Sequence, residues 1–213
     1  MQKLAPNYII PDIIIFVDLE NKYKTAQTKL TINQFFMNIV KKIVVVIAFI
    51  IALPLVAALF VPKQYTVSVS ETINKPKKEV YDYLVLLKNQ EEYSEWVKAD
   101  PNLHPTISGI DGTVGAKQSW NSRDDNVGEG EQTITALTED RIDVDIKFIR
   151  PFKSHAKAAN IFKALNENQT EVISEFYAKE IYPLNLMSYL FGRGMIKKTE
   201  IQNLKNIKQI LER

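Results

Sequence analysis

The chain has 213 residues, which is long enough for one domain with a substantial hydrophobic core and an accessory segment, but short for two full domains. Its 27 Lys and Arg nearly balance its 25 Asp and Glu, and it has no polybasic arm, so nucleic acid is not an expected partner. It contains no cysteine, which excludes disulfides, thiolate nucleophiles and cysteine-ligated metals.

Residues 1–36 carry no recognisable domain pattern. The apolar piece "YIIPDIIIFVDLENKYK" is too short to cross a bilayer and is interrupted by Pro11 and Asp12. The segment "MNIVKKIVVVIAFIIALPL", by contrast, has the short basic start that is expected ahead of a membrane anchor. We therefore expect Met37 to be the natural initiator and residues 1–36 to be an upstream in-frame extension, or at most a loosely ordered tail.

The apolar run from Ile43 to Val61 contains no charged residue. As a helix it would rise about 28 Å, close to the roughly 30 Å hydrocarbon core of a bilayer. A soluble core helix would carry a polar stripe, but this run is apolar on every face, and Pro54 is tolerated in a membrane span. We predict one transmembrane anchor over residues 37–62. A cleaved secretory signal ending at the small residues "VAA" and a buried core helix are the alternatives.

The charges that flank this run predict its orientation. Lys41 and Lys42 lie on one side and Lys63 alone on the other, so the positive-inside rule places the N-terminus in the cytoplasm. Three further lysines between residues 75 and 78 reduce the difference. The abundance of Ile, Lys and Asn is typical of AT-rich bacterial genomes. We expect a single-pass protein of the bacterial cytoplasmic membrane, with residues 63–213 outside.

Residues 63–213 show the pattern of an α+β domain. Alternation predicts a half-buried strand over residues 64–73, and Pro76 then begins an amphipathic helix with a second short helical piece at "QEEYSEWV". From Thr106 onward, alternating segments separated by turn residues predict a run of antiparallel hairpins. The tail from residue 184 to 211 has helical spacing, with a bend at its two glycines. An apolar sheet face must then wrap around this last helix.

Five segments behind the anchor carry a resemblance to a known family: "KNQEEYSEWVKADPN", "DGTVGAKQSWN", "GEGEQTI", "FIRPF" and "YPLNLM". They resemble the membrane-anchored SRPBCC proteins, from the superfamily of START lipid-transfer domains, polyketide cyclases and birch-pollen-type allergens. The resemblance covers residues 37–213. It implies a helix-grip fold, in which a curved antiparallel sheet grips a long C-terminal helix around an apolar cavity. Related sequences often have tryptophan at Ser174, so this serine implies a larger or wetter cavity.

The polar residues predict no catalytic or metal site. His104 and His155 are far apart in sequence and have no local ligand cluster, so we expect no metal and no cofactor. The pairs "GTVG" and "GEGE" precede no helix that could bind phosphate and are typical of hairpin turns and strand bulges. The acidic residues 124–131 lack calcium-loop spacing, and Asp143 and Asp145 share one strand face that is expected to meet water.

Aromatic and apolar side chains remain as candidates for a binding site. Core packing explains such residues in most proteins, but sites for apolar ligands have the same composition, and the resemblance favours a cavity. The predicted cavity-lining residues are Trp96, Trp120, Phe148, Phe152, Phe162, Ser174, Phe176, Tyr182, Met187 and Leu190.

We therefore predict a non-catalytic domain, held at the membrane, whose cavity binds a lipid or other apolar small molecule. One alternative, which the resemblance implies, is a cyclase or dehydratase acting on an apolar substrate; it requires an ionisable group in the cavity, for which His155, Tyr177 and Tyr182 are the candidates. The other is a protein-interaction module similar to the chaperone-ATPase activators of the superfamily.

Overall fold

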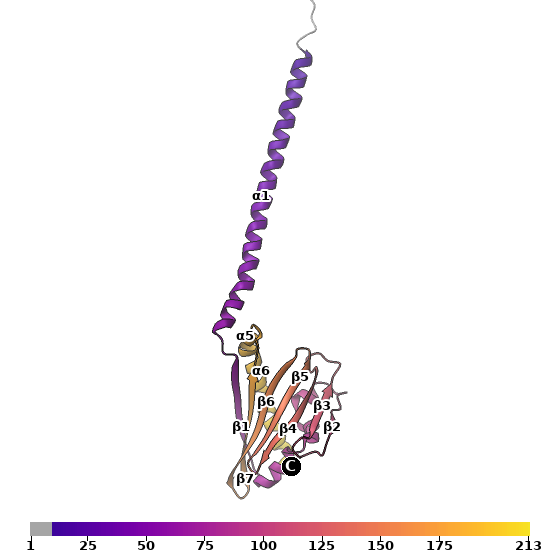
Figure 1. The fold of residues 1–213 in the computed structure, drawn as a ribbon, viewed down its shortest axis with the longest axis vertical. Helices are drawn as coiled ribbons and strands as arrows, with labels where there is room; N and C mark the ends of the chain where they lie inside the picture. The colour runs from indigo at the N-terminus through magenta and orange to yellow at the C-terminus, as the bar shows by residue number, and fades with distance from the viewer. Residues whose placement is uncertain (1–9) are drawn as a thin grey trace, which may run out of the picture. The chain divides into compact units, whose positions relative to one another are not determined.

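The computed structural model describes residues 10–213, with side chains from residue 15 on (Figure 1). By their internal contacts, residues up to Leu55 form one unit and Val56–Arg213 form another. The prediction about the translation start at Met37 is not tested by the structure, and residues 1–9 lie outside the described residues.

The first unit is almost entirely part of one helix, α1 (Ile10–Phe60), which contains Pro54. The helix begins well before the apolar run, in a segment for which the sequence predicted no regular structure. Ion pairs between residues four apart support this first half, with Lys22 Nζ 2.8 Å from Asp18 and Lys24 Nζ 2.6 Å from Glu20. Among the described residues, α1 is the one helix that is long and apolar enough to cross a membrane, a criterion that a signal sequence also meets.

The second unit is built on a seven-stranded antiparallel sheet in the order β1-β7-β6-β5-β4-β3-β2. Consecutive strands from β2 to β7 are neighbours, as expected for a run of hairpins. The strands are β1 (Gln64–Ile73), β2 (Thr106–Ser108), β3 (Lys117–Asn121), β4 (Glu129–Thr138), β5 (Arg141–Arg150), β6 (Ser154–Asn166) and β7 (Gln169–Lys179).

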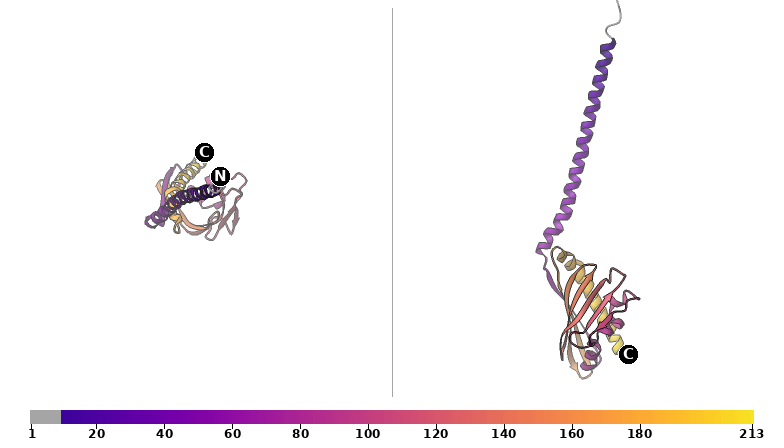
Figure 2. Two further views of the ribbon diagram at one scale, coloured as in Figure 1. Left: turned by 90° about the horizontal axis from the view of Figure 1, so that it is seen from above. Right: turned by 45° about the vertical axis from the view of Figure 1, so that its right-hand side comes forward.

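The helices of this unit lie on the inner face of the sheet. The sheet curves around α6, which is drawn in yellow (Figures 1 and 2). This is the helix-grip arrangement that the sequence predicted. The helical elements of this unit are α2 (Lys77–Leu84), the 3₁₀ turn η1 (Leu87–Asn89), α3 (Gln90–Tyr93), α4 (Glu95–Lys98), α5 (Leu184–Met187), the π-helical segment η2 (Ser188–Gly192) and α6 (Arg193–Leu211).

The hydrophobic core lies where α2 and α6 pack on the inner face of the sheet. Val80 of α2, Val172 of β7 and Leu204 of α6 are buried together in one cluster. Side chains of this size contribute about 1.5–3 kcal/mol each when fully buried. This packing closes one end of the space between the sheet and α6, so any cavity must lie towards the other end of the strands.

Buried asparagines fix α6 against the short helices opposite the sheet. Asn203 Oδ1 accepts a hydrogen bond of 2.9 Å from the Glu95 backbone N–H, and Asn206 Nδ2 donates to the Tyr93 carbonyl at 2.9 Å and to Glu95 Oε1 at 2.7 Å. Buried backbone groups outside regular ladders need such partners. The result is a rigid wall of α3, α4 and α6 that faces the sheet.

Candidate functional site

A cavity of about 840 Å³ lies between the inner face of the sheet and the wall formed by α3, α4 and α6. Its lining is mainly apolar and includes Trp96 and Val97 of α4, Val144 of β5 and Leu204 of α6. Ligand sites in proteins range from roughly 300 to 1,000 Å³ and are mostly hydrophobic. The cavity is therefore large enough for a sizeable apolar molecule.

One side of the cavity is built around Trp120, whose ring fits because the residue opposite it in the sheet is a glycine. Gly130 lies opposite Trp120 in the sheet, and a Cβ at Gly130 would lie 2.4 Å from Trp120 Cζ2 and 2.7 Å from the Lys147 carbonyl oxygen. The missing side chain lets the indole lie over the strand and pack edge-on against Phe148, with ring centroids 6.2 Å apart. The register shift between Glu129 and Gly130 is the strand bulge that the sequence predicted for "GEGE".

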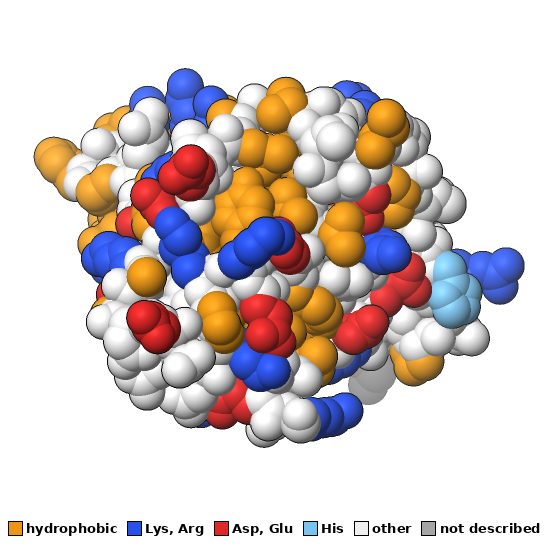
Figure 3. Space-filling view, turned by 90° about the horizontal axis from the view of Figure 1, so that it is seen from below, with side chains coloured by type: hydrophobic (Ala, Val, Ile, Leu, Met, Phe, Trp, Pro, Cys, Tyr) orange, Lys and Arg blue, Asp and Glu red, His pale blue; other side chains and the backbone are white. Residues whose placement is uncertain are grey.

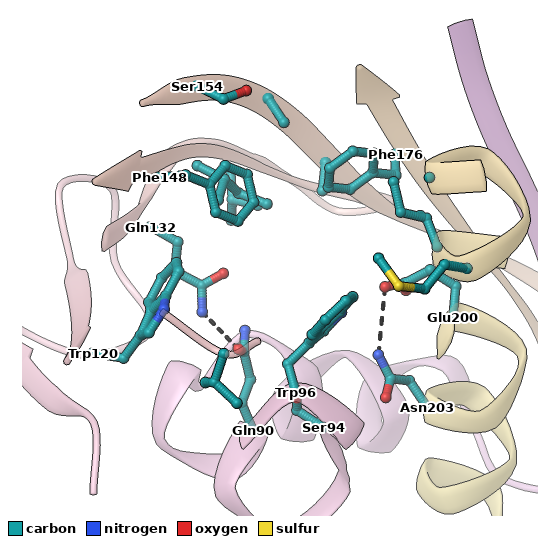
Figure 4. Close-up of a pocket in the computed structure, with 18 of the residues that line it drawn as sticks. Gln90, Ser94, Trp96, Trp120, Gln132, Phe148, Ser154, Phe176, Glu200 and Asn203 are labelled. Carbon is teal, nitrogen blue, oxygen red and sulfur yellow. Dashed lines mark hydrogen bonds between the residues drawn. The ribbon is translucent and has the colours of Figure 1, made fainter. Parts of the chain in front are cut away.

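Seven of the ten predicted lining residues are placed at the cavity (Figure 4 labels four of them). They come from α4, strands β3, β5 and β7, the β5–β6 connection and α5, so segments far apart in the sequence converge. That they bind a ligand remains a prediction. The seven are Trp96, Trp120, Phe148, Phe152, Ser174, Phe176 and Met187.

The other three predicted residues are not among those that line the cavity. Phe162 is 1% exposed and packs in the core, with its ring centroid 5.1 Å from that of Tyr81 of α2. It lies on the inner face as the alternation predicted, but at the end of the strand that α2 fills. Tyr182 and Leu190 are exposed near the start of the C-terminal helical segment, because the chain bends there before α6 begins.

Glu200 brings a carboxyl group into the cavity from α6 (Figure 4). Its Oε2 accepts a hydrogen bond of 2.8 Å from Ser174 Oγ, and its Oε1 lies 3.4 Å from Asn203 Nδ2. Among the described residues it forms no ion pair with a basic group. Burial raises the pKa of the Glu200 carboxyl. Burial is also the main cause that raises the pKa of the Tyr93 phenol, and the negative charge of Glu200 raises it further. Ser174 is thus a hydrogen-bond donor to a buried acid.

A second polar group lies across the cavity, where three glutamines are hydrogen-bonded in series. Gln132 Nε2 donates to Gln90 Oε1 at 2.6 Å and to Gln118 Oε1 at 2.5 Å, and Gln118 Nε2 donates to the Leu87 carbonyl at 2.9 Å. Figure 4 shows the Gln132 oxygen directed into the cavity, opposite Glu200. The apolar space therefore has hydrogen-bonding groups on two opposing walls.

A third polar cluster lies near the start of α6, where the Tyr65 and Ser188 hydroxyls share a hydrogen bond of 2.8 Å. Ser188 Oγ also donates to Glu180 Oε1 at 3.3 Å, and burial raises the pKa of the Glu180 carboxyl. All three residues line the cavity. This cluster lies between the cavity interior and its mouth.

The ionisable candidates that the sequence suggested for catalysis are placed differently. His155 lines the cavity, whereas Tyr177 lies on the outer face of β7, where it hydrogen-bonds to Glu175 and to Arg141 Nη2. Tyr177 faces outward because Phe176 and Ala178 take the inward positions of the alternation. His104 is exposed, 3.7 Å from a Glu91 carboxylate oxygen.

Several acidic residues outside the cavity are paired with basic side chains. Asp125 and Glu129 both contact Arg150, and Glu131 contacts Lys117 and Lys147. These contacts make the acidic hairpin part of an ion-pair network. On β5, Asp143 likewise pairs with Arg141. Among the described residues no group of three or more His, Asp or Glu side chains is arranged to hold a metal ion.

Sequence reasoning missed Glu200 and the glutamines. Glu200 directly follows Lys197, Lys198 and Thr199 in the C-terminal helix, so composition marks it as a surface residue. A signal did exist, because Glu200, Asn203 and Asn206 recur at intervals of three, the spacing of one helix face. Glu200 also lies four residues before Leu204 and seven before Ile207, which is helical spacing, and the apolar pattern already assigned these two residues to the core.

Comparison with solved structures decides the fold. The di-domain ARO/CYC StfQ from the steffimycin biosynthetic pathway has a TM-score of 0.54 at 11% identity, covering 68% of this chain and 50% of that chain. The di-domain ARO/CYC BexL from the BE-7585A biosynthetic pathway has a TM-score of 0.51 at 15% identity, covering 72% of this chain and 52% of that chain. This chain has the helix-grip fold. It spans about half the length of each of these two-domain proteins.

A single-domain match gives the same result. Protein MLL2253 from Mesorhizobium loti has a TM-score of 0.51 at 16% identity, covering 70% of this chain and 97% of that chain. No protein-family model matches the chain, and no curated protein matches its sequence. At these identities the structural matches show the fold and not an activity.

Proposed function

We propose that this protein is a membrane-tethered binding protein whose cavity holds a lipid or another apolar small molecule without converting it. The observation that carries the proposal is the cavity itself, about 840 Å³ of mainly apolar space inside a domain that is otherwise closely packed. An apolar molecule in this space would bury its own surface and that of the lining, which is favourable in water.

The apolar run of α1 supports the membrane part of the proposal. Its side chains from Ile43 to Ile51 are exposed in the chain, so they take no part in the core of the domain. Insertion into a bilayer removes such a surface from water, with the N-terminus in the cytoplasm and the domain outside, as the flanking lysines favour. A tethered cavity meets bilayer components at high effective concentration and so does not need tight affinity.

A cavity-filling variant tests ligand binding in the full-length chain. Ala158 lies between Val144 and Phe176 in the sheet and lines the cavity, so Ala158→Phe places a ring inside it. We expect native mass spectrometry of the purified wild type to detect a bound apolar molecule, and the occupancy of this variant to fall several-fold. Ala164→Phe adds the same group at an exposed position of the same strand and is expected to keep the ligand. A wild-type protein that carries nothing and takes up nothing from a lipid extract would sink the proposal.

Glu200 favours a second candidate function, cyclase or dehydratase chemistry on an apolar substrate. A carboxyl group whose pKa is raised by burial, held by Ser174 inside a cavity, is a candidate general acid or base. The two functions differ in the fate of the bound molecule. An enzyme releases a chemically changed product, which chromatography separates from the substrate and which has a lower mass if water is lost. Glu200→Gln stops this change, whereas a binding protein releases the molecule that entered.

A further inference from the structure

The mouth of the cavity is bordered by apolar side chains that are exposed. Ile181, Leu184 and Met187 line the cavity from the segment around α5, and Phe152 lines it from the β5–β6 connection. Each of these side chains is also exposed on the surface. Apolar residues therefore continue from the interior of the cavity onto the outside of the domain.

This apolar surface extends along the chain on both sides of α5. Leu190, Phe191 and Met195 follow in η2 and α6, and Phe191 is 65% exposed. Val56, Leu59 and Phe60 belong to the same unit at the end of α1, and Phe60 is 83% exposed. Soluble monomers rarely expose a contiguous apolar surface of this extent without a partner for it. The following residues are together called the mouth patch: Val56, Leu59, Phe60, Phe152, Ile181, Leu184, Met187, Leu190, Phe191 and Met195.

Asn185 fixes the end of the apolar run against the mouth patch. Its side chain is 1% exposed, and Nδ2 donates to the Ala58 carbonyl at 2.8 Å and to the Val61 carbonyl at 3.0 Å. Just beyond, the Glu180 backbone N–H donates to the Lys63 carbonyl at 2.8 Å. The last residues of the apolar run are thus bonded to the helix that borders the cavity. Wherever that run ends at a membrane surface, the mouth patch lies at the same level.

Unpaired cations surround the mouth patch. Lys63, Lys153, Lys179 and Arg193 are exposed, and none forms an ion pair with a residue that the structure describes. Glu180 is the acidic residue among them; it is half-buried, and burial raises the pKa of its carboxyl group. Exposed cations beside an apolar surface match the phosphates and acyl chains of a bilayer, and they favour anionic lipid.

The opposite end of the strands has a different surface. There Lys75, Lys77 and Lys208 pair with Glu79, Asp140 and Glu71, respectively. Seen from below, at the end of the domain away from α5, charges of both signs are interspersed with apolar side chains (Figure 3). These three lysines are thus paired with acids, whereas the cations beside the mouth patch are not.

We propose that the mouth patch docks into the head-group region of the bilayer that α1 crosses, so that the cavity exchanges its apolar ligand directly with the membrane. The inference rests on the proposed tethering. It adds that the ligand is a bilayer component, such as a lipid or an apolar molecule dissolved among lipids. Such a molecule passes between two apolar environments without crossing water, which lowers the cost of transfer.

The absence of cysteine from the sequence allows a direct test in the full-length chain. Single cysteines are placed at Phe191 in the mouth patch, at Leu165 near the β6–β7 turn and at Ile47 in the apolar run. All three side chains are exposed, so the variants keep the core, which circular dichroism checks. Each variant is labelled with an environment-sensitive fluorophore and reconstituted into phosphatidylcholine–phosphatidylglycerol vesicles. Lipids that carry a quencher at the head group or along the acyl chain report the contact.

The proposal expects strong head-group quenching at Phe191→Cys, acyl-chain quenching at Ile47→Cys and little quenching at Leu165→Cys. Quenching at Ile47→Cys with no more at Phe191→Cys than at Leu165→Cys overturns the docking and leaves the tether intact. A blue-shifted but unquenched label at Phe191→Cys also overturns it, because a protein partner or a second copy then covers the patch. No quenching at Ile47→Cys overturns the tether itself. Loss of ligand binding alone leaves these signals unchanged.

Discussion

At the scale of single residues, the acid in the cavity is the feature with the clearest consequence for stability. Burial raises the pKa of the Glu200 carboxyl, so the folded state keeps this proton to a higher pH than the unfolded chain does. The free energy of unfolding therefore falls as pH rises from the carboxyl pKa of the unfolded chain through the raised value in the folded state. Above that value the full cost of burying the charge is present.

Glu200→Gln removes this cost and keeps an acceptor for Ser174 Oγ. We expect the melting temperature of the variant to match the wild type at about pH 4 and to exceed it at about pH 8. For a domain of this size each kcal/mol corresponds to about 2–4 °C. Glu167→Gln, at an exposed position in the β6–β7 turn, is the matched control and should follow the wild type at every pH. Parallel melting curves for Glu200→Gln and wild type would contradict the argument.

The alternation in β7 predicted the inward position of Ser174, because side chains on a strand alternate strictly between its two faces. It could not predict the hydrogen bond to Glu200, because that bond depends on where α6 packs along the sheet. Phe162 shows the same limit of the sequence, because here a residue predicted to line the cavity packs in the core instead. Its inward direction follows from the sequence, but whether an inward residue meets a cavity or α2 depends on tertiary packing.

At the scale of elements, the close contact between β3, β4 and β5 depends on the missing side chain of Gly130. Gly130→Ala would place a methyl group against Trp120 and against the rigid Lys147 carbonyl, so we expect a loss of about 1–3 kcal/mol in urea unfolding. The tryptophan emission spectrum should shift as the indole moves. Gly194→Ala in α6 meets no atom within 4 Å and should instead stabilise the helix, by about 0.5–1 kcal/mol. Equal effects of the two variants would refute the role of Gly130.

The elements of the domain were largely predictable because their periodicities are strong. The first strand occupies residues 64–73 as predicted, and the C-terminal helical region begins at Leu184 and ends at Leu211. The bend near Gly192 is a π-helical segment, a detail that hydrophobic spacing does not encode. The helical first half of α1 was missed because Pro11 and Asp12 interrupt its apolar piece, and the ion pairs four residues apart that accompany the helix were not considered.

At the scale of the whole molecule, the sequence predicted an anchor and a helix-grip domain but not the connection between the last turn of α1 and the cavity mouth. That connection depends on Asn185, whose neighbours in sequence give no sign that its amide meets carbonyl groups more than a hundred residues earlier. Both hydrophobic core clusters consist of residues that follow Val56. The core should therefore form without residues 1–55, while the junction at Asn185 should not form without residues 56–62.

Two shortened chains measure the contribution of this junction. A chain of residues 63–213 lacks the Ala58 and Val61 carbonyls, so the buried Asn185 amide loses both acceptors, and we expect it to be about 1–3 kcal/mol less stable than a chain of residues 56–213. Asn185→Leu removes the need for acceptors, and the difference between the two chains should shrink in that background, as a double-mutant cycle in urea unfolding would measure. An unchanged difference would mean that apolar contacts of residues 56–62, and not the amide, hold the end of the helix at the cavity mouth.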